Sequence, residues 1–342
     1  MKKVSKWIWA VLLVVPILCS CSHFVEKVDC SKGNGIGEHG HLYVEDTQLV
    51  DEHGELVMLR GMSSHGITWF PRYLNGGAMK SLREEGANLF RLAMYTDPPG
   101  AYVEEPQKSK DYLYMGIESA LAQDMYVIVD WHILKDGDPN QYMDEAESFF
   151  GEISSHYGNN PGILYEICNE PNGETTWEDI SKYANRIIPV IRTNAPDAII
   201  LVGVPSYCTD FRGPLEKPLK FGNIMYSMHR YIDVSEKKDC GAGQLEKILG
   251  QGLPIFVTEW GIAAGEDTPF EDEEKPDLEQ YYVENARPFV ELMETYGVSW
   301  AAWALSSKDE VHSILRADCD KLSGWTRDDL TQFGKLIFDN FR

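Results

Sequence analysis

The stretch YEICNEPNG, residues 165–173, starts as an apolar run and ends in an amide and a carboxylate. Pro171 and Gly173 directly follow Asn169 and Glu170, so a strand that reaches this point must leave regular structure there. A glutamate at the end of one strand can simply cap the next helix. Whether Glu170 has a chemical role therefore depends on what the rest of the chain brings to the same place.

Seven further apolar or β-branched runs alternate with segments of helical periodicity. The clearest expected helix is Thr176–Asn194, whose apolar residues recur on one face, with Thr175 and Glu178 spaced as a capping box at its start. Leu278–Tyr296 and Asp328–Phe341 are expected to be helices for the same reason. Strands about thirty to forty residues apart, each usually followed by a helix, predict an α/β fold of the (β/α)8 TIM-barrel type. A doubly wound sheet is the alternative, but no glycine-rich phosphate turn follows the first strand. The expected strands lie near Val57–Gly61, Asn88–Met94, Tyr126–Trp131, Ile163–Cys168, Ala198–Gly203, Asn223–His229, Pro254–Trp260 and Val298–Leu305.

The beginning of the chain is typical of a targeting segment. Three lysines precede an apolar run of a dozen residues, which has the length of a secretory signal and is too short to span a bilayer. The sequence LCSC at 18–21 is similar to a bacterial lipobox, so we expect residues 1–20 to be a signal peptide and Cys21 to be lipidated. An ordinary signal peptide with a nearby cysteine is the alternative. Residues 21–39 are expected to be a short polar tether, and residues 40–342 a single barrel domain, because no linker or repeat follows.

The charge and the cysteines narrow the possible partners. The formal charge is −23, and removal of residues 1–20 would make it −23 − 3 = −26. Nucleic acid is excluded as a partner, because phosphate binding needs a basic face. An acidic chain suits an extracellular protein, secreted or held at the cell surface by its lipid, and we expect a monomer. Five cysteines would remain after processing, so at least one must be unpaired: Cys30, Cys168, Cys208, Cys240 and Cys319.

Polar and aromatic side chains recur where the expected strands end, which is the face on which barrels carry their active sites. Glu170 follows the fourth strand and Glu259 closes the seventh, and histidines and aromatic residues follow the others. Two carboxylates among such groups favour glycoside hydrolysis, in which one carboxyl donates a proton and the other attacks the anomeric carbon. Metal-assisted hydrolysis by His65, His132 and His229 is an alternative, although no cysteine–histidine spacing predicts a metal site.

Seven motifs in the same order resemble those of glycoside hydrolase family 5, and most closely its bacterial endo-β-1,4-glucanase (cellulase) branch. The resemblance runs from about residue 40 to the C-terminus. It implies a (β/α)8 catalytic domain, a retaining double-displacement mechanism and no metal or organic cofactor. The motifs are LRGMSSHGITWF, FRLAMYT, VIVDWH, YEICNEPNG, MHRY, PIFVTEWG and WALSSKDE.

The resemblance also implies roles for individual residues. Glu170 matches the general acid/base and Glu259 the nucleophile, while Arg91 and Tyr231 match the residues that hydrogen-bond the nucleophile. Asn169 matches the residue that holds the sugar 2-hydroxyl. Supporting or substrate-binding roles are implied for His132, His229, Trp303, His65, Trp69, Tyr95, Lys308 and Glu310.

Two departures from the family pattern concern the side where the leaving-group sugars bind. A tryptophan is usual after the fifth strand, whereas this chain has VPSYCTDF, so Tyr207 is expected to take its place. MHRY carries Arg230 where an aromatic residue is common. The expected substrate is a cellulose-type β-glucan, and mannan, xyloglucan or mixed-linkage β-glucan are alternatives on the same scaffold. A non-catalytic carbohydrate-binding lipoprotein is the remote alternative, which the presence of both glutamates disfavours.

Overall fold

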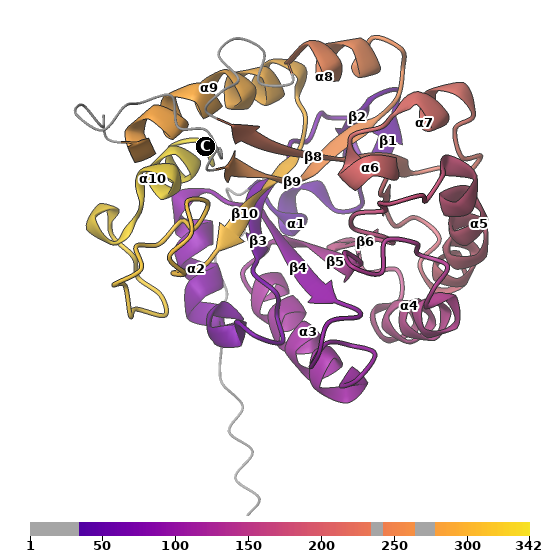
Figure 1. The fold of residues 1–342 in the computed structure, drawn as a ribbon, viewed down its shortest axis with the longest axis horizontal. Helices are drawn as coiled ribbons and strands as arrows, with labels where there is room; N and C mark the ends of the chain where they lie inside the picture. Colours follow the sequence, from indigo (N-terminus) through magenta and orange to yellow (C-terminus); the bar gives the residue numbers. More distant parts are fainter. Residues whose placement is uncertain (1–33, 234–241, 264–277) are drawn as a thin grey trace, which may run out of the picture.

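The computed structural model describes residues 34–233, 242–263 and 278–342, and its centre is a closed barrel of eight parallel strands. The strands follow one another around the barrel in chain order, and the last pairs with the first to close it. Helices surround the strands on the outside (Figure 1). The predicted (β/α)8 barrel is therefore confirmed. Its strands are β3 (Arg60–Ser64), β4 (Leu89–Tyr95), β5 (Tyr126–His132), β6 (Ile163–Glu166), β7 (Ile200–Val202), β8 (Ile224–Asp233), β9 (Ile255–Ala263) and β10 (Trp300–Leu305).

The predicted helices form, with two corrections. α5 starts at a capping box made by Thr176 and Asp179, not by the expected pair one residue earlier. The Thr175 hydroxyl instead donates to Gly137 O at 3.0 Å, on the loop after β5. The last expected helix is split, because Leu330 is extended and Thr331 caps a new helix. The larger helices are α2 (Gly76–Glu85), α3 (Pro106–Leu121), α4 (Met143–Tyr157), α5 (Trp177–Asn194), α8 (Ala242–Leu249), α9 (Leu278–Tyr296) and α10 (Gln332–Asp339), with short turns at η2 (Pro71–Tyr73), α7 (Arg212–Glu216) and η3 (Arg327–Asp329).

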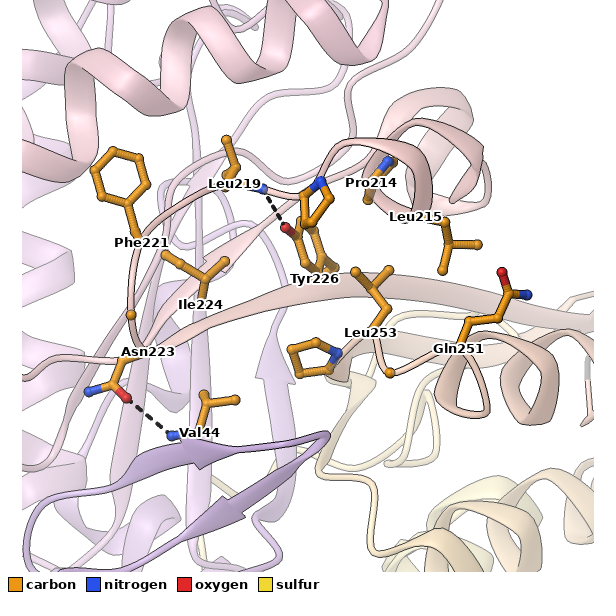
Figure 2. Close-up of a pocket in the computed structure, with 14 residues that line it drawn as sticks. Val44, Pro214, Leu215, Leu219, Phe221, Asn223, Ile224, Tyr226, Gln251 and Leu253 are labelled. Atoms are coloured by element: carbon orange, nitrogen blue, oxygen red, sulfur yellow. Dashed lines mark hydrogen bonds between the residues drawn. The ribbon is translucent and has the colours of Figure 1, made fainter.

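A hairpin that the sequence did not predict covers the N-terminal end of the barrel. β1 (Tyr43–Glu45) and β2 (Gln48–Val50) pair antiparallel, and the neighbouring Leu42 and Leu49 join the apolar cluster inside the lower barrel. Val44 N donates to Asn223 Oδ1 at 3.1 Å, just before β8 begins (Figure 2). The hairpin therefore closes the end of the barrel opposite to the expected active site.

Residues 34–39, which the sequence placed in the tether, belong to the folded domain. They include α1 (Ile36–His39), where Gly37 N donates to Asp124 Oδ1 at 2.7 Å. Asn88 Nδ2 donates to Asn34 O at 2.9 Å. The expected boundary at residue 40 is therefore too late. The predicted signal peptide and Cys21 lie outside the described residues, and no helix within the described ranges is long and apolar enough to cross a membrane.

The interior of the barrel changes from apolar to polar along three neighbouring strands. Leu89, Ile128 and Leu164 belong to the lower apolar cluster. Alternate residues of a strand point to the same side, so the residues two positions further along lie above them in the barrel. Those residues are Arg91, Asp130 and Glu166, all completely buried. A buried charged layer thus separates the apolar lower core from the C-terminal end.

Candidate active site

Asn169 and Glu170 lie where the chain leaves β6 towards the C-terminal end of the barrel. Asn169 N donates to Trp131 O at 3.1 Å, and Cys208 Sγ donates to Asn169 O at 2.9 Å. Contacts with β5 and with the segment that follows β7 thus hold this exit in place. The side chain of Glu170 reaches β8, where its Oε1 hydrogen-bonds His229 Nδ1 at 2.8 Å.

Glu259 comes from β9 and is held by two hydrogen-bond donors. Arg91 Nη1 donates to its Oε2 at 2.9 Å, and the Tyr231 hydroxyl donates to its Oε1 at 2.7 Å. Both carboxylate oxygens of Glu259 are thus fixed in orientation by hydrogen-bond donors. The ionised carboxylate is the form that can attack an electrophilic carbon.

The two carboxylates approach each other across the end of the barrel. One carboxylate oxygen of Glu170, one of Glu259 and a ring nitrogen of His229 all lie within 4.8 Å of one another. Retaining glycosidases keep their carboxyl groups about 5–5.5 Å apart, whereas inverting enzymes need about 6.5–9.5 Å to admit a water molecule. The arrangement therefore has the spacing of a retaining pair.

Arg91 lies at the centre of a buried ion cluster that was only partly foreseen from the sequence. Its Nε donates to Glu166 Oε2 at 2.7 Å, its Nη2 donates to Asn169 Oδ1 at 2.6 Å, and Nη2 lies 3.0 Å from Asp130 Oδ2. Glu166 and Asp130 were not among the predicted site residues. A signal was present, because each is a single acid within an otherwise apolar strand and would be buried there.

Glu170 and His229 form a proton-sharing pair. Burial alone would lower the pKa of His229, but the charge of Glu259, the nearby Glu166 carboxylate and the hydrogen bond with Glu170 outweigh it and raise the pKa to about 10. Burial would raise the pKa of Glu170, yet the hydrogen bond and charge of His229 lower it overall. In the resting site, therefore, the shared proton lies mainly on the histidine.

His132 supports Asn169 from β5. Its Nδ1 hydrogen-bonds Asp130 Oδ2 at 2.6 Å, and its Nε2 lies 3.3 Å from Asn169 Nδ2, which also donates to Ile133 O. Burial, reinforced by the positive charge of Arg91, lowers the pKa of His132 to about 3. The imidazole is therefore neutral at ordinary pH, and Asn169 is oriented by several partners at once.

The other predicted binding residues form a cluster of rings and charges beside this centre. Trp303 stacks on His132 with ring centroids 5.5 Å apart, and Tyr95 lies 4.0 Å from the same imidazole. Trp69 packs edge-on against Tyr95 and is 45 % exposed, so its indole ring is available to a ligand.

A charged group completes this side of the site. Lys308 Nζ lies 3.2 Å from His65 Nε2 and donates to Glu310, while Glu310 Oε2 lies 3.2 Å from His312 Nε2. Burial, reinforced by the charge of Lys308, lowers the pKa of His65 to about 4. His312 was not predicted from the sequence. Charged and hydrogen-bonding groups next to exposed rings suit the hydroxyl edges and apolar faces of a sugar.

Tyr207 lies on the turn that follows β7, in the short segment α6 (Pro205–Cys208). Its side chain is 51 % exposed, and its backbone N donates to Pro171 O at 3.1 Å, directly after Glu170. Tyr207 therefore lies next to the loop that carries Glu170, and its contact with the leaving-group sugars stays a prediction. Among the described cysteines, Cys168, Cys208 and Cys319 are buried and unpaired, whereas Cys30 and Cys240 lie outside the described residues.

The three histidines considered for a metal site do not form a ligand set together. His65 contacts Lys308, and His132 contacts Asp130. Of the three histidines, His229 is the one that lies near Glu170 and Glu259. Both ring nitrogens of His229 are engaged, by Glu170 and by the Thr258 hydroxyl at 3.0 Å. We therefore assign these groups to acid–base chemistry.

Comparisons with known proteins agree with this geometry. The family model described as "Cellulase (glycosyl hydrolase family 5)" matches residues 50–309. The chain is 44 % identical over 306 residues to a protein named Endoglucanase A of Butyrivibrio fibrisolvens, covering 88 % of this chain and 68 % of that one. It is 37 % identical to an endoglucanase of Clostridium saccharobutylicum over 98 % of this chain and 71 % of the relative.

Solved structures agree as well. The catalytic domain of a Thermobifida fusca endoglucanase in complex with cellotetraose superimposes with a TM-score of 0.78 at 32 % identity, covering 90 % of this chain and 98 % of that one. A halotolerant family 5 cellulase from an Icelandic hot spring isolate superimposes with a TM-score of 0.80 at 34 % identity, covering 90 % and 96 % of the two chains.

Proposed function

The chain belongs to the cellulase family, glycosyl hydrolase family 5, and is an endoglucanase, and we propose that it cleaves internal β-1,4-glucosidic bonds of cellulose or a related β-glucan with retention of configuration. In this proposal Glu170 is the general acid/base and Glu259 is the nucleophile. The observation that carries it is the approach of the two carboxylates to within 4.8 Å.

The proposed reaction has two steps. Glu259 attacks the anomeric carbon while Glu170 gives a proton to the glycosidic oxygen, so the leaving sugar departs as an alcohol and a glycosyl ester forms on Glu259. Glu170, now an anion, then takes a proton from water as that water attacks the same carbon and releases Glu259. In this proposal Asn169 holds the 2-hydroxyl of the sugar that is cleaved. This hydrogen bond accelerates the reaction if it is stronger in the transition state than in the bound substrate.

The stereochemistry of the first product tests this mechanism directly. Proton NMR of early β-glucan hydrolysis should show the β-anomer before mutarotation. The isosteric Glu259→Gln variant should lose nearly all hydrolysis while remaining folded, because the amide oxygen can still accept from Arg91 and the amide nitrogen can donate to the Tyr231 hydroxyl oxygen. An α-anomer appearing first, or substantial residual activity of Glu259→Gln, would contradict the assignment.

The substrate proposal concerns β-1,4-glucan rather than related chains. The relatives named endoglucanases and the cellotetraose complex support it. Initial rates on carboxymethylcellulose, lichenan, glucomannan and xyloglucan measured side by side would test it. A preference for glucomannan or xyloglucan would assign the chain to one of the alternative substrates.

We also propose that the protein is exported, that Cys21 carries lipid at a bacterial membrane, and that it acts as a monomer. The lysine-rich start, the apolar run and LCSC at 18–21 support the anchor. In the native host, the wild type should fractionate with membranes and Cys21→Ser should become soluble. A soluble wild type would favour ordinary secretion, and a dimer by light scattering would overturn the monomer proposal.

A further inference from the structure

Glu166 has no part in the reaction above, yet it lies directly behind the acid/base. Its side chain is completely buried in β6. Its Oε1 is 3.9 Å from His229 Nε2, and the other ring nitrogen of His229 bonds Glu170 at 2.8 Å. His229 is therefore placed between two carboxylates, Glu170 at the end of the barrel and Glu166 in its interior.

Glu166 is rigidly held in its charged form. Ser227 Oγ donates to its Oε1 at 2.7 Å, and Arg91 Nε donates to its Oε2 at 2.7 Å. Burial alone would raise the pKa of Glu166, but the charge of Arg91 and the proximity of His229 lower it to about 2. The side chain thus presents a fixed negative charge to His229 at all ordinary pH values.

We propose that Glu166 is a positioning residue that keeps the mobile proton of catalysis on the Glu170–His229 pair and thereby sets the alkaline limit of hydrolysis. This inference rests on the proposed function of Glu170. With His229 Nδ1–H donated to Glu170 Oε1, the mobile proton lies either on His229 Nε2 or on the free oxygen of Glu170. On Nε2 it is hydrogen-bonded to the Thr258 hydroxyl at 3.0 Å, and the Glu166 carboxylate lies 3.9 Å away. The mobile proton leaves from Glu170 to the glycosidic oxygen, and the attacking water returns one proton to the pair, so the proton count balances over a turnover.

The other charged groups near His229 leave this role to Glu166 during the second step. Arg91 is positive, and Asp130, whose pKa burial raises well above its ordinary value, is paired with Arg91 at 3.0 Å. Glu259 carries no charge once the glycosyl bond has turned it into an ester. During hydrolysis of that ester, Glu166 is the carboxylate other than Glu170 that lies within 4.0 Å of His229 among the described residues, and its charge favours the uptake of a proton from water.

The variant Glu166→Gln tests this proposal because it removes the charge but keeps the shape. The amide oxygen can accept from Arg91, and the amide nitrogen can donate to Ser227. In the pH profile of kcat/KM, we expect the alkaline limb to move to lower pH by about one unit. The reason is that the Glu170–His229 pair loses the nearby negative charge of Glu166, which favours its protonated form. The matched control is Ser227→Ala, which removes one hydrogen bond but leaves the charge, and its alkaline limb should not move. A uniform fall in rate for Glu166→Gln, with the limb unmoved, would reduce Glu166 to a structural partner of Arg91 and overturn the proposal.

A second measurement does not depend on hydrolysis. In the inactive variant Glu170→Gln/Glu259→Gln, nitrogen NMR should find His229 titrating above its ordinary value of about 6.5, because Glu166 remains. Adding Glu166→Gln should lower that pKa by about one unit. An ordinary value with Glu166 present would overturn the inference. Failure of the wild type to hydrolyse any β-glucan would instead count against the proposed function, which keeps the two failures distinct.

Discussion

Glu170 and Glu259 are the same side chain with different neighbours, and the neighbours separate their proposed roles. Glu259 accepts hydrogen bonds from a guanidinium and a phenol, which fix the orientation of its carboxylate for the proposed attack. Glu170 is bonded to His229, a group that can hold or return a proton. Two carboxyls in unlike environments are what acid–nucleophile catalysis requires.

The hydroxyl of Tyr231 should contribute to this difference. Tyr231→Phe removes the hydrogen bond to Glu259 Oε1 but keeps the ring, and a bond to a charged group is worth about 1.5–3 kcal/mol. We therefore expect kcat to fall by about 10- to 100-fold with little change in the thermal unfolding temperature.

Tyr226→Phe is the matched control for that experiment. Its hydroxyl accepts from Leu219 N at 2.9 Å at the opposite end of β8 (Figure 2), and its loss should leave kcat unchanged. Equal kcat for Tyr231→Phe and the wild type would show that the hydroxyl does not support the nucleophile.

At the scale of elements, the exit of β6 depends on the turn after β7. Ser206, Tyr207 and Cys208 all have φ near +57°, a left-handed conformation that costs non-glycine residues free energy. The hydrogen bonds from Tyr207 N to Pro171 and from the Cys208 thiol to Asn169 offset that cost. The turn and the catalytic loop therefore hold each other in place.

Gly203, between β7 and this turn, should be intolerant of a side chain. A Cβ there would lie 2.3 Å from Cys168 O and 2.8 Å from Asn169 O, so Gly203→Ala must displace the backbone that carries Glu170. We expect both a lower unfolding temperature and a lower kcat. Gly151→Ala in α4 is the control, because its Cβ would meet only Val190 at 3.5 Å and a helical alanine should stabilise by about 0.5–1 kcal/mol. Wild-type kcat in Gly203→Ala would contradict the coupling.

Asp51 gives the hairpin and α1 a pH-dependent link. It accepts from His53 N and Glu55 N and bonds His39 at 3.0 Å, and the His39 bond is the main cause that lowers its pKa to about 2. Because the folded pKa is below the unfolded value of about 3.9, the stabilisation is complete above that value and is lost as pH falls towards 2. The difference in unfolding free energy between wild type and Asp51→Asn should therefore be largest near about pH 6 and about half as large near pH 3. A difference that does not change with pH would rule out the charge as its source.

At the scale of the whole molecule, residues 34–39 complete the lower end of the barrel. A chain beginning at Asn34 should fold like the full protein. A chain beginning at His41 should have a free energy of unfolding, measured in urea, about 2–4 kcal/mol lower than the chain beginning at Asn34. The reason is that Asn88 and Asp124 lose their hydrogen-bond partners in the removed segment. Equal stability of the two truncated chains would place the domain boundary at residue 40 after all.

The large negative charge should also act on the molecule as a whole. A formal charge of −23 opposes compaction by self-repulsion, and salt screens that repulsion. We expect the unfolding temperature to rise between about 0.02 M and about 0.5 M sodium chloride, where the screening length falls from over 20 Å to under 5 Å. An unchanged or falling unfolding temperature would show that local ion pairs outweigh the net charge.

Much of this architecture could be predicted from local patterns. Each strand is a short apolar run bounded by turn residues, and each polar strand end is visible in its own motif, so Glu170, Glu259 and Arg91 could be named in advance. No role could be assigned to Glu166 and Asp130 from the sequence, because the role of an acid in an apolar strand depends on the residues that it contacts in the folded barrel. The hairpin was missed because its strands are three residues each, too short for a periodic signal.

The sequence by itself determined the order of strands and helices, the barrel they close, and the residue types at the end of each strand. The folded arrangement alone shows which of these groups form ion pairs and which pair shares a proton. Arg91 meets Glu166 across 75 residues and Glu259 across 168, and His229 lies between two carboxylates from β6 and the loop that follows it. The physical reason is that hydrogen bonds and Coulomb interactions act over a few ångströms, and barrel closure sets those distances.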